Sequence, residues 1–181
     1  MKTYIALLRG INVSGHNIIK MDALKLSFIQ LGFNEVVTYI QSGNVIFISE
    51  ENNTSKIETT IIKAIKTKFG YDIKALVITK KELEITFNSN PFIKIHDVDV
   101  TKLCVTFLRN NPTLENVPQI EKLIANANDE FKITKKSIYL HCPTGFAKTK
   151  LTNNLFERKL KTDATPRNWR TITKLLELSN Q

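Results

Sequence analysis

The sequence predicts an α+β protein made of two similar halves that follow one another along the chain. Over residues 1–90, hydrophobic periodicity gives the element order strand, helix, strand, strand, helix, strand. Residues 102–109 (KLCVTFLR) then repeat the opening strand at an offset of 100 positions, including its final Leu-Arg pair. These observations predict a tandem duplication of ferredoxin-like, βαββαβ-type halves packed together, with an extra C-terminal helix.

Apolar runs and turn residues define the elements of the first half. Its predicted strands cover residues 3–9, 36–40, 45–48 and 73–78. Its predicted helices cover residues 21–31, 55–69 and a segment from Thr79 that ends before Asn90-Pro91. The middle strands flank Gln41-Ser42-Gly43-Asn44, which is typical of a hairpin turn because glycine and asparagine accept positive φ angles.

Two further patterns in this half predict local structure. Ser55 with Glu58, and Thr79 with Glu82, each have the spacing of a capping box, in which both side chains bond backbone N–H groups at a helix start. Several strand residues, such as 4–8, are apolar at consecutive positions. We therefore expect the first sheet to be covered on both faces, by its own helices and by the other half.

The second half is predicted to repeat these elements up to its second helix. Its predicted strands cover residues 102–109, 131–134 and 137–141, and its predicted helices cover residues 118–127 and 153–160. The last element differs, because Thr165 fits an N-cap and Pro166 fits the first helical position, so a closing helix is predicted from there. The halves, 1–90 and 100–181, are expected to meet at a joint over residues 91–99.

Size and composition place the chain among globular proteins. It has 181 residues, of which 42% are hydrophobic and 24% are charged, and no apolar run is long enough to cross a bilayer. The N-terminus lacks the pattern of a signal peptide. Cys104 and Cys142 form neither a disulfide framework nor a metal knuckle, so we expect reduced thiols in a cytoplasmic protein with no metal and no cofactor.

The net charge of +9 is concentrated in one C-terminal stretch. Between residues 131 and 174 there are eleven lysines and arginines but only two acids, Glu157 and Asp163, and the charges of the remaining chain cancel. A segregated basic excess favours an anionic partner, while a solvated basic face with no ligand accounts for the same count.

Polar residues in the first half are candidates for contacting such a partner. In the segment LLRGINVSGHN, Arg9 and Asn12 stand where an apolar strand gives way to a glycine-bearing loop, although no Walker or dinucleotide-binding pattern is present. In the hairpin turn, Ser42 and Asn44 offer a hydroxyl and an amide. Structural roles account for these residues equally well, because turn chemistry explains the hairpin and Arg9 recurs as Arg109.

The second half supplies basic candidates. Arg167, Asn168 and Arg170 lie at the start of the predicted closing helix, where the helix dipole disfavours each cation by about 0.3–1 kcal/mol and a bound anion would reverse the sign. Lys148 and Lys150 follow a strand in the segment HCPTGFAKTK, which resembles an anion-holding strand–loop–helix entry but matches no named phosphate motif. Ion pairs with nearby acids and a solvated loop are the alternatives.

Four segments, LLRGINVSGHN, TYIQSGNVIF, SNPF and RNWRTITKLLEL, occur in this order along the chain. With them the sequence resembles the bacterial domain-of-unknown-function family 1697, through the motifs Leu-Leu-Arg-Gly-Ile-Asn-Val, Gln-Ser-Gly-Asn-Val and Thr-x-Arg-Asn-Trp. The resemblance spans essentially the whole length and implies a fold of two similar α+β halves. It implies no activity, substrate or cofactor.

Three functional hypotheses follow from the residues. The preferred one is that the basic C-terminal half binds a phosphate-bearing or other anionic ligand, either nucleic acid or an anionic small molecule. The second is an enzyme whose anionic substrate lies in a cleft between the halves. There the candidates of the first half would face those of the second: Arg9, Asn12, Ser42 and Asn44 opposite Arg167, Asn168 and Arg170. The third is a structural or interaction protein whose motifs only lock the halves together. No membrane partner is expected.

Overall fold

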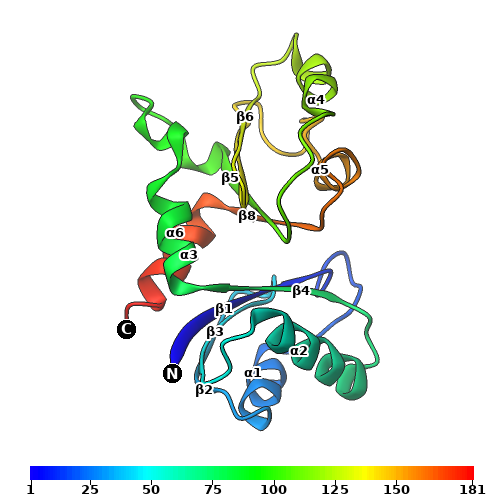
Figure 1. Ribbon diagram of the computed structural model, residues 1–181, viewed down its shortest axis with the longest axis vertical. Helices are drawn as coiled ribbons and strands as arrows, with labels where there is room; N and C mark the ends of the chain where they lie inside the picture. The colour runs from blue at the N-terminus through cyan, green and yellow to red at the C-terminus, as the bar shows by residue number, and fades with distance from the viewer. The chain divides into compact units, whose positions relative to one another are not determined.

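The computed structural model describes the whole chain, residues 1–181. It is a mixed α+β structure with two four-stranded antiparallel sheets and six α-helices. The chain forms two compact units: the first is Met1–Ile85 together with Leu175–Gln181, and the second is Thr86–Lys174. Each unit contains one of the two sheets (Figure 1). Every helix is too short or too polar to span a membrane.

The first unit has the order of elements predicted for it. These elements are β1 (Lys2–Arg9), α1 (Met21–Gln30), β2 (Asn34–Tyr39), β3 (Asn44–Ser49), α2 (Thr54–Phe69), β4 (Lys74–Thr79) and the first part of α3 (Lys80–Asn88). The strand order in its sheet is β2-β3-β1-β4. The opening strand β1 therefore lies inside the sheet and pairs antiparallel with both β3 and β4.

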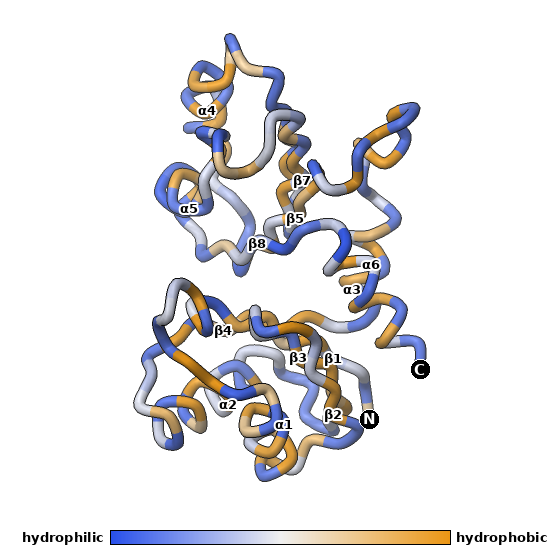
Figure 2. The backbone as a smooth tube through the Cα atoms, turned by 180° about the vertical axis from the view of Figure 1, so that it is seen from behind, coloured by the Kyte–Doolittle hydropathy of each residue, from blue (hydrophilic) through white to orange (hydrophobic).

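Helices α1 and α2 cover one face of this sheet (Figure 1). Phe28 of α1 and Ile61 of α2 join Tyr4 of β1 in one buried hydrophobic cluster. Ile5 and Leu7 alternate with Tyr4 along the strand and point to the opposite face, yet both are 0% exposed. Both faces of β1 are therefore buried, as its unbroken apolar run predicts, and Figure 2 shows this strand as a hydrophobic segment.

The capping box predicted at Thr79 and Glu82 is confirmed at the start of α3. The Glu82 carboxylate accepts bonds from the N–H and the hydroxyl of Thr79 at 2.8 and 2.9 Å. The Thr79 hydroxyl oxygen in turn accepts the Glu82 N–H at 3.1 Å. The two side chains thus satisfy donors at the helix start reciprocally.

The capping box predicted at Ser55 and Glu58 is wrong. Asn53 caps α2 instead, because its side-chain oxygen accepts the Lys56 N–H at 3.2 Å. Glu58 turns toward the sheet and is only 5% exposed, and its carboxylate accepts the N–H of Val77 at 2.7 Å. Because the Glu58 carboxylate bonds this strand N–H, it cannot also bond an N–H group at the start of α2. Asparagine caps a helix as well as serine does, so Asn53 takes the capping position.

The second unit places its four strands in the same way. Its elements are two 3-10 turns (Pro91–Lys94 and Val100–Lys102), β5 (Leu103–Leu108), α4 (Val117–Ile124), β6 (Glu130–Ile133), β7 (Ser137–His141), α5 (Asn153–Leu160), β8 (Ala164–Asn168) and the first part of α6 (Trp169–Leu178). The strand order is β6-β7-β5-β8, so each strand has the position of its counterpart in the first sheet.

The two faces of the second sheet are buried differently. On one face, Ile120 of α4 and Phe156 of α5 pack with Leu140 of β7 in a second hydrophobic cluster. On the other face, Tyr139 is 2% exposed and its hydroxyl donates to the carbonyl of Thr86 at 2.9 Å. The polar tip of this tyrosine is satisfied by backbone at the C-terminal end of α3.

The prediction of a helix that starts at Thr165 is wrong. Residues Ala164–Asn168 form strand β8, which pairs antiparallel with β5 and places Arg167 opposite Val105. Pro166 is tolerated because β8 is an edge strand of the sheet. The helix begins at Trp169, and the Asn168 side chain accepts the Thr171 N–H at 2.9 Å, which is the contact an N-cap makes.

Candidate functional site

Four of the predicted site residues lie at one end of the first sheet. Arg9 ends β1, Asn12 lies in the loop that follows, Ser42 lies in the turn between β2 and β3, and Asn44 begins β3. The Asn12 amide nitrogen donates to the carbonyls of Ile19 and Gln41, each at 3.0 Å. Because Gln41 belongs to the hairpin turn, this amide joins the loop after β1 to the tip of the hairpin.

Both asparagine amides at this end serve the backbone around them. The Asn12 side-chain oxygen accepts the Ile19 N–H at 2.8 Å, so all three of these Asn12 bonds go to main-chain groups. Asn44 is 0% exposed and donates to the Tyr39 carbonyl at 3.1 Å and to the Ser42 hydroxyl at 3.0 Å. These contacts support a structural role, and a ligand contact at these four residues stays a prediction.

Arg9 is the last residue of β1, and Arg109 directly follows the end of β5. The strand register places Lys74 opposite Arg9 in the first sheet. Arg109 forms an ion pair with Asp163 at 3.3 Å. Arg109 is therefore held by an acid of its own unit.

The C-terminal candidates gather at one end of the second sheet, which we call the basic end. Strand β7 finishes there at His141 and β8 at Asn168, because the antiparallel register pairs these residues with Leu103 and Cys104 at the start of β5. The loop after β7 carries Lys148 and Lys150, and Arg170 is the second residue of α6. All three of these cations are exposed.

Lys102, immediately before β5, is a further cation close to the loop of the basic end. A Cβ on Gly145 would lie 3.8 Å from the Lys102 Nζ atom, so this ammonium group stands against the loop. The pKa of Asp99 is lowered by hydrogen bonds from Thr101 and, more weakly, by the charges of Lys102 and Arg170, so both cations act on this carboxylate. Sequence reasoning did not select Lys102, because only the fold brings it to this loop.

The loop between β7 and α5 is held by its own backbone. The N–H of Gly145 donates to the Cys142 carbonyl at 2.8 Å, and the N–H of Lys148 donates to the Gly145 carbonyl at 3.2 Å, which gives two consecutive turns. The Thr149 hydroxyl then donates to the buried carboxylate of Asp129 at 2.5 Å. The backbone that carries Lys148 and Lys150 is therefore ordered by these bonds.

Arg167 is separated from the exposed cations. It is 8% exposed, and one guanidinium nitrogen donates to the Pro166 carbonyl at 2.8 Å. Burial lowers the pKa of Arg167 to about 10. The predicted position in the first turn of a helix is wrong because this residue belongs to β8, whereas Asn168 and Arg170 do flank the start of α6.

The two cysteines are free and buried. Burial raises the pKa of Cys104 to about 12 and that of Cys142 to about 11. Thiols with such pKa values are protonated at neutral pH and are poor nucleophiles. The structure contains no group of three or more histidine, cysteine, aspartate or glutamate side chains placed to hold a metal ion.

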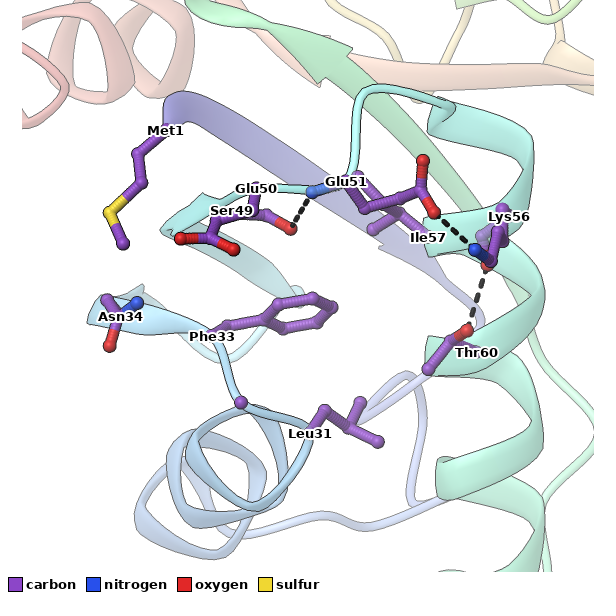
Figure 3. Close-up of a pocket in the computed structure, with 11 residues that line it drawn as sticks. Met1, Leu31, Phe33, Asn34, Ser49, Glu50, Glu51, Lys56, Ile57 and Thr60 are labelled. Carbon is purple, nitrogen blue, oxygen red and sulfur yellow. Dashed lines mark hydrogen bonds and ion pairs between the residues drawn. The ribbon is translucent and has the colours of Figure 1, made fainter.

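A cavity of about 460 Å³ opens in the first unit, beside the start of α2 and at the end of the sheet away from Arg9 (Figure 3). Its lining includes Phe33 and the carboxylates of Glu50 and Glu51, and Glu51 forms an ion pair with Lys56 at 2.5 Å. None of the nine predicted site residues lines this cavity. Its carboxylates would repel an anion, so it is not the site that the sequence predicts.

Comparison with known proteins supports the fold and identifies the family. The structure is similar to "the structure of conserved bacterial protein SP0830 from Streptococcus pneumoniae", with a TM-score of 0.71, 21% sequence identity and coverage of 98% of each chain. Comparison with curated proteins gives no match. A family model described as "Protein of unknown function (DUF1697)" matches residues 1–139, which include the opening and hairpin motifs. The chain therefore belongs to the DUF1697 family, as its resemblance to that family predicts.

Proposed function

We propose that the protein binds a phosphate-bearing or other anionic partner, with nucleic acid as the first candidate, through the basic surface of residues 131–174. The observation that carries this proposal is that eight of the eleven segregated cations are exposed. The exposed ones are Lys132, Lys135, Lys136, Lys148, Lys150, Arg158, Lys161 and Arg170. Clustered, solvated lysines and arginines attract polyanions because binding releases the counterions condensed on the phosphates.

The two acids of this stretch are held in contacts within the fold. The Glu157 carboxylate accepts the Ala164 N–H at 3.0 Å. Asp163 forms its ion pair with Arg109, outside the basic stretch. Eleven cations against two acids leave this stretch with a net positive charge, which favours a positive potential at its surface.

We also infer that residues 1–90 and 100–181 are the two halves of a ferredoxin-like duplication, joined by residues 91–99, and that the protein is cytoplasmic. The common strand order of the two sheets supports the duplication. A matching main-chain contact supports it too: the Leu8 N–H donates to the Gly43 carbonyl at 2.7 Å, and the Leu108 N–H donates to the Lys136 carbonyl at 2.8 Å. Two free, buried cysteines fit a reducing compartment.

The proposal is tested by fluorescence polarisation with labelled oligonucleotides over a series of salt concentrations. We expect binding at low salt, and the logarithm of the binding constant should fall linearly with the logarithm of the salt concentration. The charge reversal Lys148→Glu/Lys150→Glu should weaken binding by about tenfold or more at low salt. The matched control, Lys25→Glu/Lys63→Glu, makes the same change of charge at exposed sites of the first unit and should weaken it much less. Absence of binding at low salt, or binding independent of salt, would contradict the proposal.

A further inference from the structure

We propose that the partner of the basic end is a single-stranded nucleic acid and that the Phe146 ring is the platform on which one of its bases stacks. This inference rests on the proposed function, because it names the class of anion that the same surface binds. It assigns to Phe146 a role that neither the family match nor the structural neighbour provides.

Phe146 is an unusual phenylalanine in this chain. It is 39% exposed, and it is the one phenylalanine of ten that lies in the exposed class. The single tryptophan, Trp169, is by contrast 3% exposed and stacks on Phe87 with ring centroids 5.0 Å apart. A phenylalanine ring left in solvent offers apolar surface on which a ligand can stack.

The backbone of the loop fixes the position of Phe146. The Lys148 N–H to Gly145 carbonyl bond closes a four-residue turn, and Phe146 is its second residue. The turn before it is closed by the bond from the Gly145 N–H to the Cys142 carbonyl, and Thr149 anchors the following residues to Asp129. A ring on such an ordered backbone loses little conformational entropy when it binds a ligand.

The loop that carries this ring also carries or approaches several cations. Lys148 and Lys150 follow it within four residues, and the Lys102 Nζ atom approaches Gly145, the residue directly before it. Arg170 is the next cation, since it and Lys102 both act on Asp99. An aromatic face with ammonium groups beside it matches a nucleotide, whose base stacks while the adjoining phosphates take the positive charges.

The exposed ring favours a single strand over a duplex. In a duplex the faces of the bases are stacked on one another, so a loop phenylalanine could reach them only after unstacking. In a single strand each base offers a free face, and stacking on an aromatic side chain tolerates any sequence. The proposed complex is therefore strong for unstructured oligonucleotides and has little sequence preference.

The test compares Phe146→Ala, Phe146→Tyr and the control Leu114→Ala in binding to an oligothymidylate and to a duplex of equal length. Leu114 is 59% exposed and lies away from the loop in sequence, so its loss controls for removal of a surface apolar side chain. We expect Phe146→Ala to weaken oligothymidylate binding about five- to hundredfold, Phe146→Tyr to bind like the wild type, and Leu114→Ala to have no effect. In a Phe146→Trp variant, the new indole should lose fluorescence when a base of the oligonucleotide stacks on it. The native Trp169 is buried, so its own fluorescence should not change.

The outcomes separate this inference from the function on which it rests. If neither nucleic acid binds at low salt, the proposed function fails. If both bind but the duplex binds as tightly and Phe146→Ala matches the wild type, the basic surface stands and the stacking role is wrong. Unchanged Phe146→Trp fluorescence in the saturated complex would also overturn the stacking role.

Discussion

The main chain of Leu8 and the main chain of Gly43 are in direct contact at the end of the first sheet. The Leu8 N–H donates to the Gly43 carbonyl at 2.7 Å. A Cβ on Gly43 would lie 2.7 Å from the Leu8 Cβ and 2.9 Å from the Ile11 Cδ1, and the φ angle of Gly43 is 76°. Two of the three motifs that carry the family resemblance thus meet at a point where only glycine fits.

The substitution Gly43→Ala should therefore destabilise the protein strongly. Left-handed backbone costs a non-glycine residue about 1–2 kcal/mol, and the clash with Leu8 adds to this, so we expect a loss of about 2–4 kcal/mol. The control is Gly15→Ala, where φ is 79° but nothing lies within 4 Å of the new Cβ. Urea unfolding of the two variants measures the difference, and equal losses would show that the close approach carries no energy.

Asn12 predicts a second structural dependence. The substitution Asn12→Asp keeps the shape of the side chain but replaces the amide N–H groups by an oxygen that faces the carbonyls of Ile19 and Gln41. We expect a loss of about 1–3 kcal/mol, because two donors disappear and acceptors are left opposed. The control Gln41→Glu adds the same charge on an exposed side chain and should leave the unfolding free energy within about 0.5 kcal/mol of the wild type. Equal stability of the two variants would contradict the assigned bonds.

Sequence periodicity predicted most of the fold because most elements carry their own signal. Helix α5 has the predicted bounds, Asn153–Leu160, and the hairpins and the Thr79–Glu82 cap were found as expected. Strand β8 could not be predicted in this way, because Ala-Thr-Pro-Arg-Asn has no apolar alternation and resembles a helix start. Its strand conformation comes from pairing with β5, which is distant in sequence.

The candidate site was less accessible from the sequence than the fold. Lys148, Lys150 and Arg170 could be selected by charge, and the fold brings them to one end of the second sheet. Phe146 carried only a weak signal, its place in a basic loop, because exposure of a ring depends on the turn that presents it. Arg167 was selected for a charge that burial removes from the surface. Composition shows that charge is present, whereas three-dimensional packing decides which charges a ligand meets.

Arg167 and Arg170 should respond to alanine substitution in opposite ways. Arg167→Ala removes a buried side chain and its bond to the Pro166 carbonyl, so we expect a loss of about 2 kcal/mol in stability and a change of less than about twofold in oligonucleotide affinity. Arg170→Ala, at an exposed site, should change stability by less than about 0.5 kcal/mol and reduce the salt slope of binding by about 1. Thermal unfolding and polarisation titrations measure both. Weaker binding by Arg167→Ala with unchanged stability would reverse the assignment.

The buried thiols predict a loss of stability at alkaline pH. Their folded pKa values, about 12 for Cys104 and about 11 for Cys142, lie above the value of 9.0 for an unperturbed thiol. Between pH 9 and 11 the unfolded chain therefore releases these protons first, and the free energy of unfolding falls as pH rises through this window. At pH 10 the expected loss is about 1 kcal/mol for each thiol.

The double variant Cys104→Ala/Cys142→Ala tests this dependence. It should be less stable than the wild type at pH 8, because two core side chains are truncated, by about 1–3 kcal/mol in total. Its unfolding free energy should fall less steeply between pH 8 and 10, so the gap between the proteins narrows by about 2 kcal/mol as pH rises. Lysine and tyrosine titrations affect both proteins alike and cancel in this difference. Parallel pH profiles would mean that the thiols titrate normally in the folded state, in contradiction to their burial in the core of the second unit.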